Sequence, residues 1–121
     1  MNHQATIVTA SSKNLQQRKH ERFVVKAPAI LRLPMTQGGT YLITVIEVSK
    51  TGLRISCPIA LESGARVEVK VLGSTVLGTA RYAREVEREF YVGIEADTVE
   101  PRIEGAQGDD FDLTQLFLAG R

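Results

Sequence analysis

Residues 66–71 read Arg-Val-Glu-Val-Lys-Val, a strict alternation of charged and apolar side chains. This period of two is typical of a β-strand with one buried face and one face in water. The segments 23–33 and 41–48 are rich in β-branched residues, and we predict strands there. Glycine-bearing turn candidates separate three further predicted strands, at 53–57, 75–85 and 90–95. No segment with helical periodicity separates them, which favours an antiparallel barrel or sandwich over a sheet of βαβ units.

Six short strands are enough for a small closed barrel, which leaves no exposed sheet edge. Pro28 lies inside the segment 23–33. Proline has no amide hydrogen to donate to a neighbouring strand, so we expect Pro28 at an edge or a bulge. The predicted fold class is therefore all-β, a six-stranded antiparallel small barrel.

The chain has 121 residues, which predicts one compact domain with short tails. We divide it into a flexible basic arm (1–22), the barrel (23–100), and a linker with a short amphipathic helix (101–121). The helix is expected to have about ten residues, too few to be stable alone in water, so we expect it to pack on its own barrel in preference to a partner. Asp109 or Asp110 is expected to cap its N-terminus, and Gly120 suits its C-terminus. The expected apolar stripe is Phe111, Leu113, Leu116 and Phe117.

Composition indicates an ordinary soluble protein, with 43% apolar and 24% charged residues. The single cysteine, Cys57, allows no internal disulfide and, without a histidine-rich cluster, no structural zinc site. The N-terminus has no signal-peptide core, and no stretch approaches the roughly 18 apolar residues of a membrane span. We expect a cytoplasmic protein that does not insert into membranes.

Charge is distributed unevenly along the chain. Residues 1–35 contain six basic residues and one acidic residue, whereas residues 85–121 contain three basic and ten acidic residues. The N-terminal end can therefore attract anions.

Catalysis has little support in the sequence. The two histidines, His3 and His20, both lie in the predicted arm, and neither has a serine or cysteine nucleophile at a known motif spacing. The chain contains no phosphate-binding loop, dinucleotide fingerprint, paired-histidine zinc motif or EF-hand loop. We predict that the protein is not an enzyme and has no catalytic residues, metal or cofactor.

Two arginines, Arg18 and Arg22, stand four positions apart directly before the first predicted strand. In an extended chain their Cα atoms lie about 13 Å apart with the side chains on one side, and in a helical turn the side chains are neighbours. Either arrangement lets both guanidinium groups grip one ligand. A guanidinium pairs bidentately with phosphate and with the O6/N7 edge of guanine.

A second polar segment follows about 25 residues later, with Glu47, Ser49 and Gly52 near a strand end. The period of two places Glu47 and Ser49 on one face of the strand. Gly52 is expected to supply the positive φ of a tight turn.

Together these segments resemble the PilZ domain family, whose signature is R-x-x-x-R followed by [D/N]-x-S-x-x-G. The resemblance covers about 17–97 and includes the run from Pro58 to Gly64 and the segment Tyr91-Val-Gly93-Ile. It implies a six-stranded antiparallel barrel and a cytoplasmic bacterial receptor for cyclic di-GMP. It also implies that the ligand, which carries two phosphates and two guanines, is bound by Arg18, Arg22, Glu47, Ser49 and Gly52, and that the arm then changes conformation to signal to a protein partner.

Glu47 departs from the family pattern, because its carboxylate sits one methylene further out than that of aspartate. A misplaced polar contact of this kind costs about 1–3 kcal/mol, a tenfold to somewhat over a hundredfold loss of affinity. The alternative is a PilZ-like protein–protein adaptor that does not bind the nucleotide. Binding to single-stranded DNA or RNA is not expected, because the chain has no Trp and no basic aromatic strand face. The sequence leaves monomer and dimer open.

Overall fold

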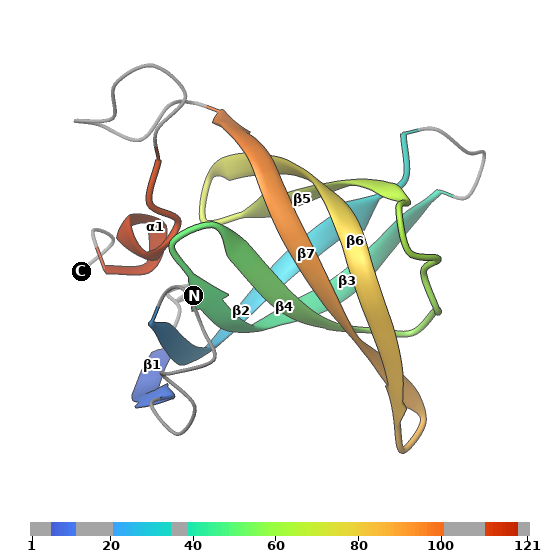
Figure 1. Cartoon of the computed structure of the whole chain (residues 1–121), viewed down its shortest axis with the longest axis horizontal. Helices are drawn as coiled ribbons and strands as arrows, with labels where there is room; N and C mark the ends of the chain where they lie inside the picture. The colour runs from blue at the N-terminus through green and yellow to red at the C-terminus, as the bar shows by residue number, and fades with distance from the viewer. Residues whose placement is uncertain (1–5, 12–20, 35–38, 101–110, 119–121) are drawn as a thin grey trace.

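The computed structural model describes residues 6–11, 21–34, 39–100 and 111–118. It contains seven strands and one short helix (Figure 1). These elements are β1 (Thr6–Ser11), β2 (Arg22–Arg32), β3 (Thr40–Ser49), β4 (Gly52–Cys57), β5 (Arg66–Val71), β6 (Ser74–Val86), β7 (Glu89–Glu100) and α1 (Thr114–Leu118).

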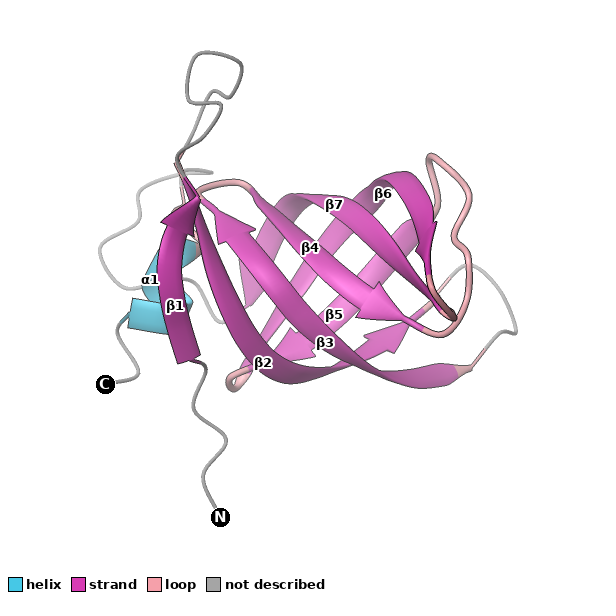
Figure 2. Ribbon diagram, turned by 90° about the horizontal axis from the view of Figure 1, so that it is seen from below, coloured by secondary structure: helices cyan, strands magenta, loops and turns pink. Residues whose placement is uncertain are grey.

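Six of the strands close into a ring, as Figure 2 shows from a second direction. The strand order is β1-β2-β3-β4-β7-β6-β5, and β5 pairs back to β2 through Ile30–Lys70, Leu31–Val69 and Arg32–Glu68. All of these pairings are antiparallel. The predicted six-stranded antiparallel barrel is confirmed, and the alternating segment 66–71 is strand β5.

Strand β1 is a correction to the sequence analysis, which expected no strand before residue 23. Thr6–Ser11 pairs antiparallel with the first half of β2, from Ser11 opposite Arg22 to Thr6 opposite Lys26. The physical reason is that β2 is too long for β5 to cover. β5 pairs only with Ile30–Arg32, and β1 satisfies backbone groups of Arg22–Lys26 on the same edge. Residues 1–5 and 12–20 of the predicted arm lie outside the described residues.

Pro28 occupies the kind of position that its chemistry requires. On one side it pairs with Thr44 of β3, next to a bulge between Val24 and Ala27. On the other side it falls between the stretch of β2 that pairs with β1 and the stretch that pairs with β5. The missing amide hydrogen therefore leaves no strand pairing broken.

The core fills the barrel with aliphatic side chains from alternate strand positions. Leu31, Val45, Ile55 and Val69 are all fully buried. Burying one such side chain contributes about 1.5–3 kcal/mol.

The C-terminal segment adds two further buried side chains to this core, Leu113 and Phe117. Packing on the protein's own barrel is therefore confirmed. The helix begins later than the predicted caps imply, because Asp112 caps it: Asp112 Oδ1 accepts a hydrogen bond from the Thr114 amide at 3.0 Å. The alternative caps Asp109, Asp110 and Gly120 lie outside the described residues.

Candidate functional site

Strands β2 and β3 bring the two polar segments together. Arg22, at the start of β2, lies opposite Ser49, at the end of β3, and Glu47 lies opposite Arg54 of β4. The predicted residues Arg22, Glu47, Ser49 and Gly52 therefore surround one end of the β3–β4 hairpin. Arg18 lies outside the described residues.

The carboxylate of Glu47 is shared by two guanidinium groups. Arg22 Nη1 lies 3.5 Å and Arg54 Nη2 lies 3.4 Å from the same oxygen, Oε1. The Glu47 side chain is 9% exposed, whereas those of Arg22 and Arg54 are 34% and 25% exposed. The cluster thus has a buried anion beneath two partly exposed cations and carries one net positive charge.

Arg54 is a site residue that the sequence analysis missed. Its Nε donates a hydrogen bond to Tyr82 Oη of β6 at 3.1 Å. The Tyr82 ring reaches Arg54 by crossing Gly93 of β7, where a Cβ atom would lie 2.2 Å from the ring. Arg54, Gly93 and Tyr82 are cross-strand neighbours on β4, β7 and β6. The alternation of 53–57 marks Arg54 as outward-facing, but only the strand register places it beside Glu47.

Arg22 has unused hydrogen-bonding capacity. Its Nε is buried and has no hydrogen-bond partner among the described residues. A buried donor without a partner costs about 1–3 kcal/mol. Glu47 therefore holds the guanidinium in place, while its Nε has no acceptor within the described part of the chain.

The turn between β3 and β4 is closed by the side chain of Ser49. The Gly52 amide donates to Ser49 Oγ at 3.1 Å. The reason predicted for Gly52 is wrong, because Gly52 does not have a positive φ. Glycine is required instead by a close approach of β7: a Cβ atom on Gly52 would lie 2.9 Å from the backbone oxygen of Ile94.

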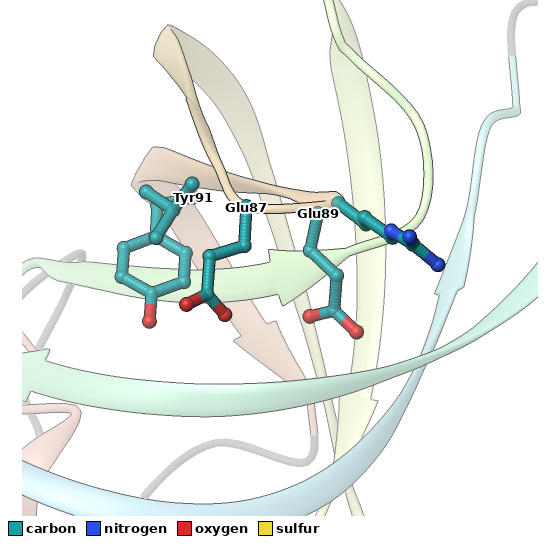
Figure 3. A pocket seen from close by; sticks show the side chains of 5 residues that line it. Glu87, Glu89 and Tyr91 are labelled. Atoms are coloured by element: carbon teal, nitrogen blue, oxygen red, sulfur yellow. The ribbon is translucent and has the colours of Figure 1, made fainter.

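A separate hollow of about 380 Å³ lies at the tip of the β6–β7 hairpin, at the other end of the barrel from α1 (Figures 1 and 3). Figure 3 shows the carboxylates of Glu87 and Glu89 and the hydroxyl of Tyr91 turned to the same side. Glu89 is also hydrogen-bonded to Ser56. Arg88 also lines the hollow, so its charged lining is two carboxylates and one guanidinium group.

Cys57 offers no reactive thiol. Burial raises the pKa of its side chain, so the thiol stays protonated near neutral pH. Its Sγ also donates a hydrogen bond to the Ile59 carbonyl oxygen at 3.0 Å.

Within residues 6–11, 21–34, 39–100 and 111–118, no group of three or more His, Cys, Asp or Glu side chains could hold a metal ion. In that same part of the chain, no helix has the length and apolar character needed to cross a bilayer.

Comparison with known proteins identifies the barrel. The family model for the PilZ domain matches residues 16–104, which include both polar segments and all six strands of the ring. A search of curated proteins found no match. The chain belongs to the PilZ domain family.

Proposed function

We propose that this protein is a receptor module that binds cyclic di-GMP on the surface formed by Arg22, Glu47, Ser49 and Gly52. PilZ domains are in general receptors and adaptors, and cyclic di-GMP is the ligand of many of them. In this role the chain binds and signals without catalysing a reaction. The bacterial cytoplasm, where this messenger acts, is the proposed location.

The observation that carries the proposal is the Arg22–Glu47 ion pair, at 3.5 Å, between segments 25 residues apart. This ion pair supports a single surface on which the guanidinium group of Arg22 lies beside the turn at the end of β3. The Nε of Arg22 has no hydrogen-bond partner among the residues that the structure describes. A phosphate or the Hoogsteen edge of guanine supplies acceptors that suit a guanidinium. Arg18, four residues earlier in the chain, is proposed as the second ligand-binding arginine.

Signalling would follow from a change in the ion-pair partners of Arg22 and Arg54. In the free protein Glu47 neutralises part of the charge of Arg22 and Arg54. A doubly anionic ligand competes with Glu47 for both guanidinium groups, so binding alters the charge and the conformation of the N-terminal segment that carries Arg18 and Arg22. A protein partner would detect that altered surface.

Calorimetric titration of the full chain with cyclic di-GMP tests the proposal. We expect saturable heat and a rise in melting temperature in the micromolar range. If several hundred micromolar ligand produces no heat and no rise in melting temperature, the proposal is wrong. Cyclic di-AMP, which has the same phosphates and no guanine O6, is the matched control and should bind far more weakly.

Glu47→Asp is expected to increase the affinity for cyclic di-GMP about tenfold. The shorter side chain restores the acceptor position typical of the family, and it withdraws the carboxylate from the two guanidinium groups that it now contacts. Titrations of the wild type and the variant at equal ionic strength measure the change. Weaker binding by Glu47→Asp would contradict this account of Glu47.

Arg54→Ala is expected to weaken binding about tenfold, because it removes one of the two cations that face the ligand beside Glu47. Arg66→Ala is the matched control, since Arg66 is also an outward-facing strand arginine paired with a carboxylate, that of Asp97. It should bind within twofold of the wild type. If the two variants bound cyclic di-GMP with equal affinity, Arg54 would not be part of the binding site.

The second candidate function is a protein–protein adaptor that does not use the nucleotide. It is favoured by Glu47, which already supplies the anion for Arg22 and Arg54. Retention of a partner by the Arg22→Ala variant, with and without cyclic di-GMP, would support the adaptor. Capture that depends on the nucleotide would support the receptor.

A further inference from the structure

The turn between β3 and β4 is attached to the C-terminal segment of the chain. The Leu113 amide donates a hydrogen bond to the Lys50 carbonyl oxygen at 2.8 Å. The next carbonyl oxygen, that of Thr51, accepts from the Ala96 amide of β7 at 2.9 Å. Both residues between Ser49 and Gly52 are therefore held by backbone atoms from outside the hairpin.

The residues that make this attachment are well anchored. Leu113 is 0% exposed and Phe117 is 2% exposed, and both belong to the hydrophobic core. The Asp112 carboxylate fixes the first turn of α1 by accepting from the Thr114 amide. The two figures agree that α1 lies at the end of the barrel where β3 passes into β4 (Figures 1 and 2).

The attached segment lies outside the region that the PilZ family model matches. The PilZ model matches residues 16–104, whereas the docked segment is 111–118. A turn inside the matched region thus accepts a backbone hydrogen bond from a segment outside it. The Lys50 carbonyl oxygen is the atom of the turn that this segment holds.

We propose that Leu113 and Phe117 are positioning residues for the ligand-binding turn. The inference rests on the proposed binding of cyclic di-GMP at this turn. Undocking of the segment removes the donor to Lys50, so the turn between Ser49 and Gly52 loses one of its two outside supports. Because coupling between two sites is reciprocal, ligand bound at the turn must in return strengthen the docking of Leu113 and Phe117.

Phe117→Ala tests the forward direction. We expect cyclic di-GMP to bind about tenfold more weakly, while circular dichroism at the assay temperature shows a folded barrel. Phe117→Leu, which keeps an apolar side chain in the same place, should recover most of the affinity. Leu118→Ala is the matched control, because Leu118 follows directly in the same helix and is 39% exposed; it should bind like the wild type.

Asp112→Ala provides a milder variant in case Phe117→Ala does not fold. Loss of the cap loosens α1 without opening a cavity in the core. We expect binding about threefold weaker, again compared with Leu118→Ala.

Hydrogen exchange on the unmodified chain tests the reverse direction and separates positioning from a merely structural role. We expect the Leu113 amide to exchange at least several-fold more slowly with saturating cyclic di-GMP, while the Leu77 amide on β6 serves as the reference. Wild-type affinity in Phe117→Ala and Asp112→Ala, or unchanged exchange at Leu113 in a wild type that binds, would overturn the positioning role alone. Absence of binding by the wild type would overturn the proposed function and this inference with it.

Discussion

Arg22→Ala is expected to reduce the affinity for cyclic di-GMP by about 100-fold or more. An arginine that grips a phosphate or a guanine edge makes two charge-assisted hydrogen bonds, each contributing about 1.5 kcal/mol or more, and about 3 kcal/mol corresponds to 100-fold. The variant also leaves Glu47 with Arg54 as its sole cation among the described ion pairs, so the ligand meets less positive charge. Isothermal titration calorimetry on the two proteins measures the difference.

Arg32→Ala is the control for this experiment. Arg32 lies at the other end of the same strand and is paired with a carboxylate, that of Glu68, at 3.0 Å. Its side chain is 53% exposed, so the loss of the pair should change stability by less than about 1 kcal/mol. Affinity for cyclic di-GMP should stay within twofold of the wild type. If Arg22→Ala bound as well as Arg32→Ala, the assignment of the site would be wrong.

Gly78→Ala should lower the free energy of unfolding by about 3 kcal/mol, because the added methyl group overpacks the buried contact between the paired strands β6 and β7. A Cβ atom on Gly78 would lie 2.4 Å from the backbone oxygen of Glu95 and 3.0 Å from Ile94 Cγ2. The clash involves backbone, which cannot rotate away as a side chain can, so β6 and β7 must separate. Thermal unfolding followed by circular dichroism should show a fall in melting temperature of roughly 10–20 °C.

Gly64→Ala separates this clash from the general effect of adding a methyl group to a glycine. A Cβ atom on Gly64 would meet nothing within 4 Å, although Gly64 has a φ of +93°. Its cost is the backbone strain of a left-handed conformation, about 1–2 kcal/mol. We expect Gly64→Ala to be clearly more stable than Gly78→Ala. If Gly78→Ala were the more stable variant, the paired strands β6 and β7 would be able to move apart and accept the added methyl group.

The strands were largely predictable because local patterns determine them. Val67, Val69 and Val71 alternate with charged residues, and in the structure all three are buried. Pro28 also behaves as its missing amide hydrogen requires. Strand β1 was missed although Thr6 to Thr9 are all β-branched, because the need for a seventh strand depends on the unequal lengths of β2 and β5.

The site was predictable only in part. Spacing and resemblance identified Arg22, Glu47, Ser49 and Gly52, and strand pairing brings all four to one hairpin end. Arg54 could not be placed, because its contact with Glu47 depends on a bulge between Val45 and Glu47 that shifts the register. A bulge adds one residue to one strand, and nothing in the local composition fixes where it falls.

The divided edge of β2 has a consequence for how the chain folds. Its partners on that edge come from β1 and β5, and the pairing of Ile30 with Lys70 joins residues about forty positions apart. The ring cannot close during synthesis until β7, which joins β4 to β6, has left the ribosome. Such distant pairings are slow to form, so the barrel should acquire its native state in milliseconds to seconds and not in microseconds.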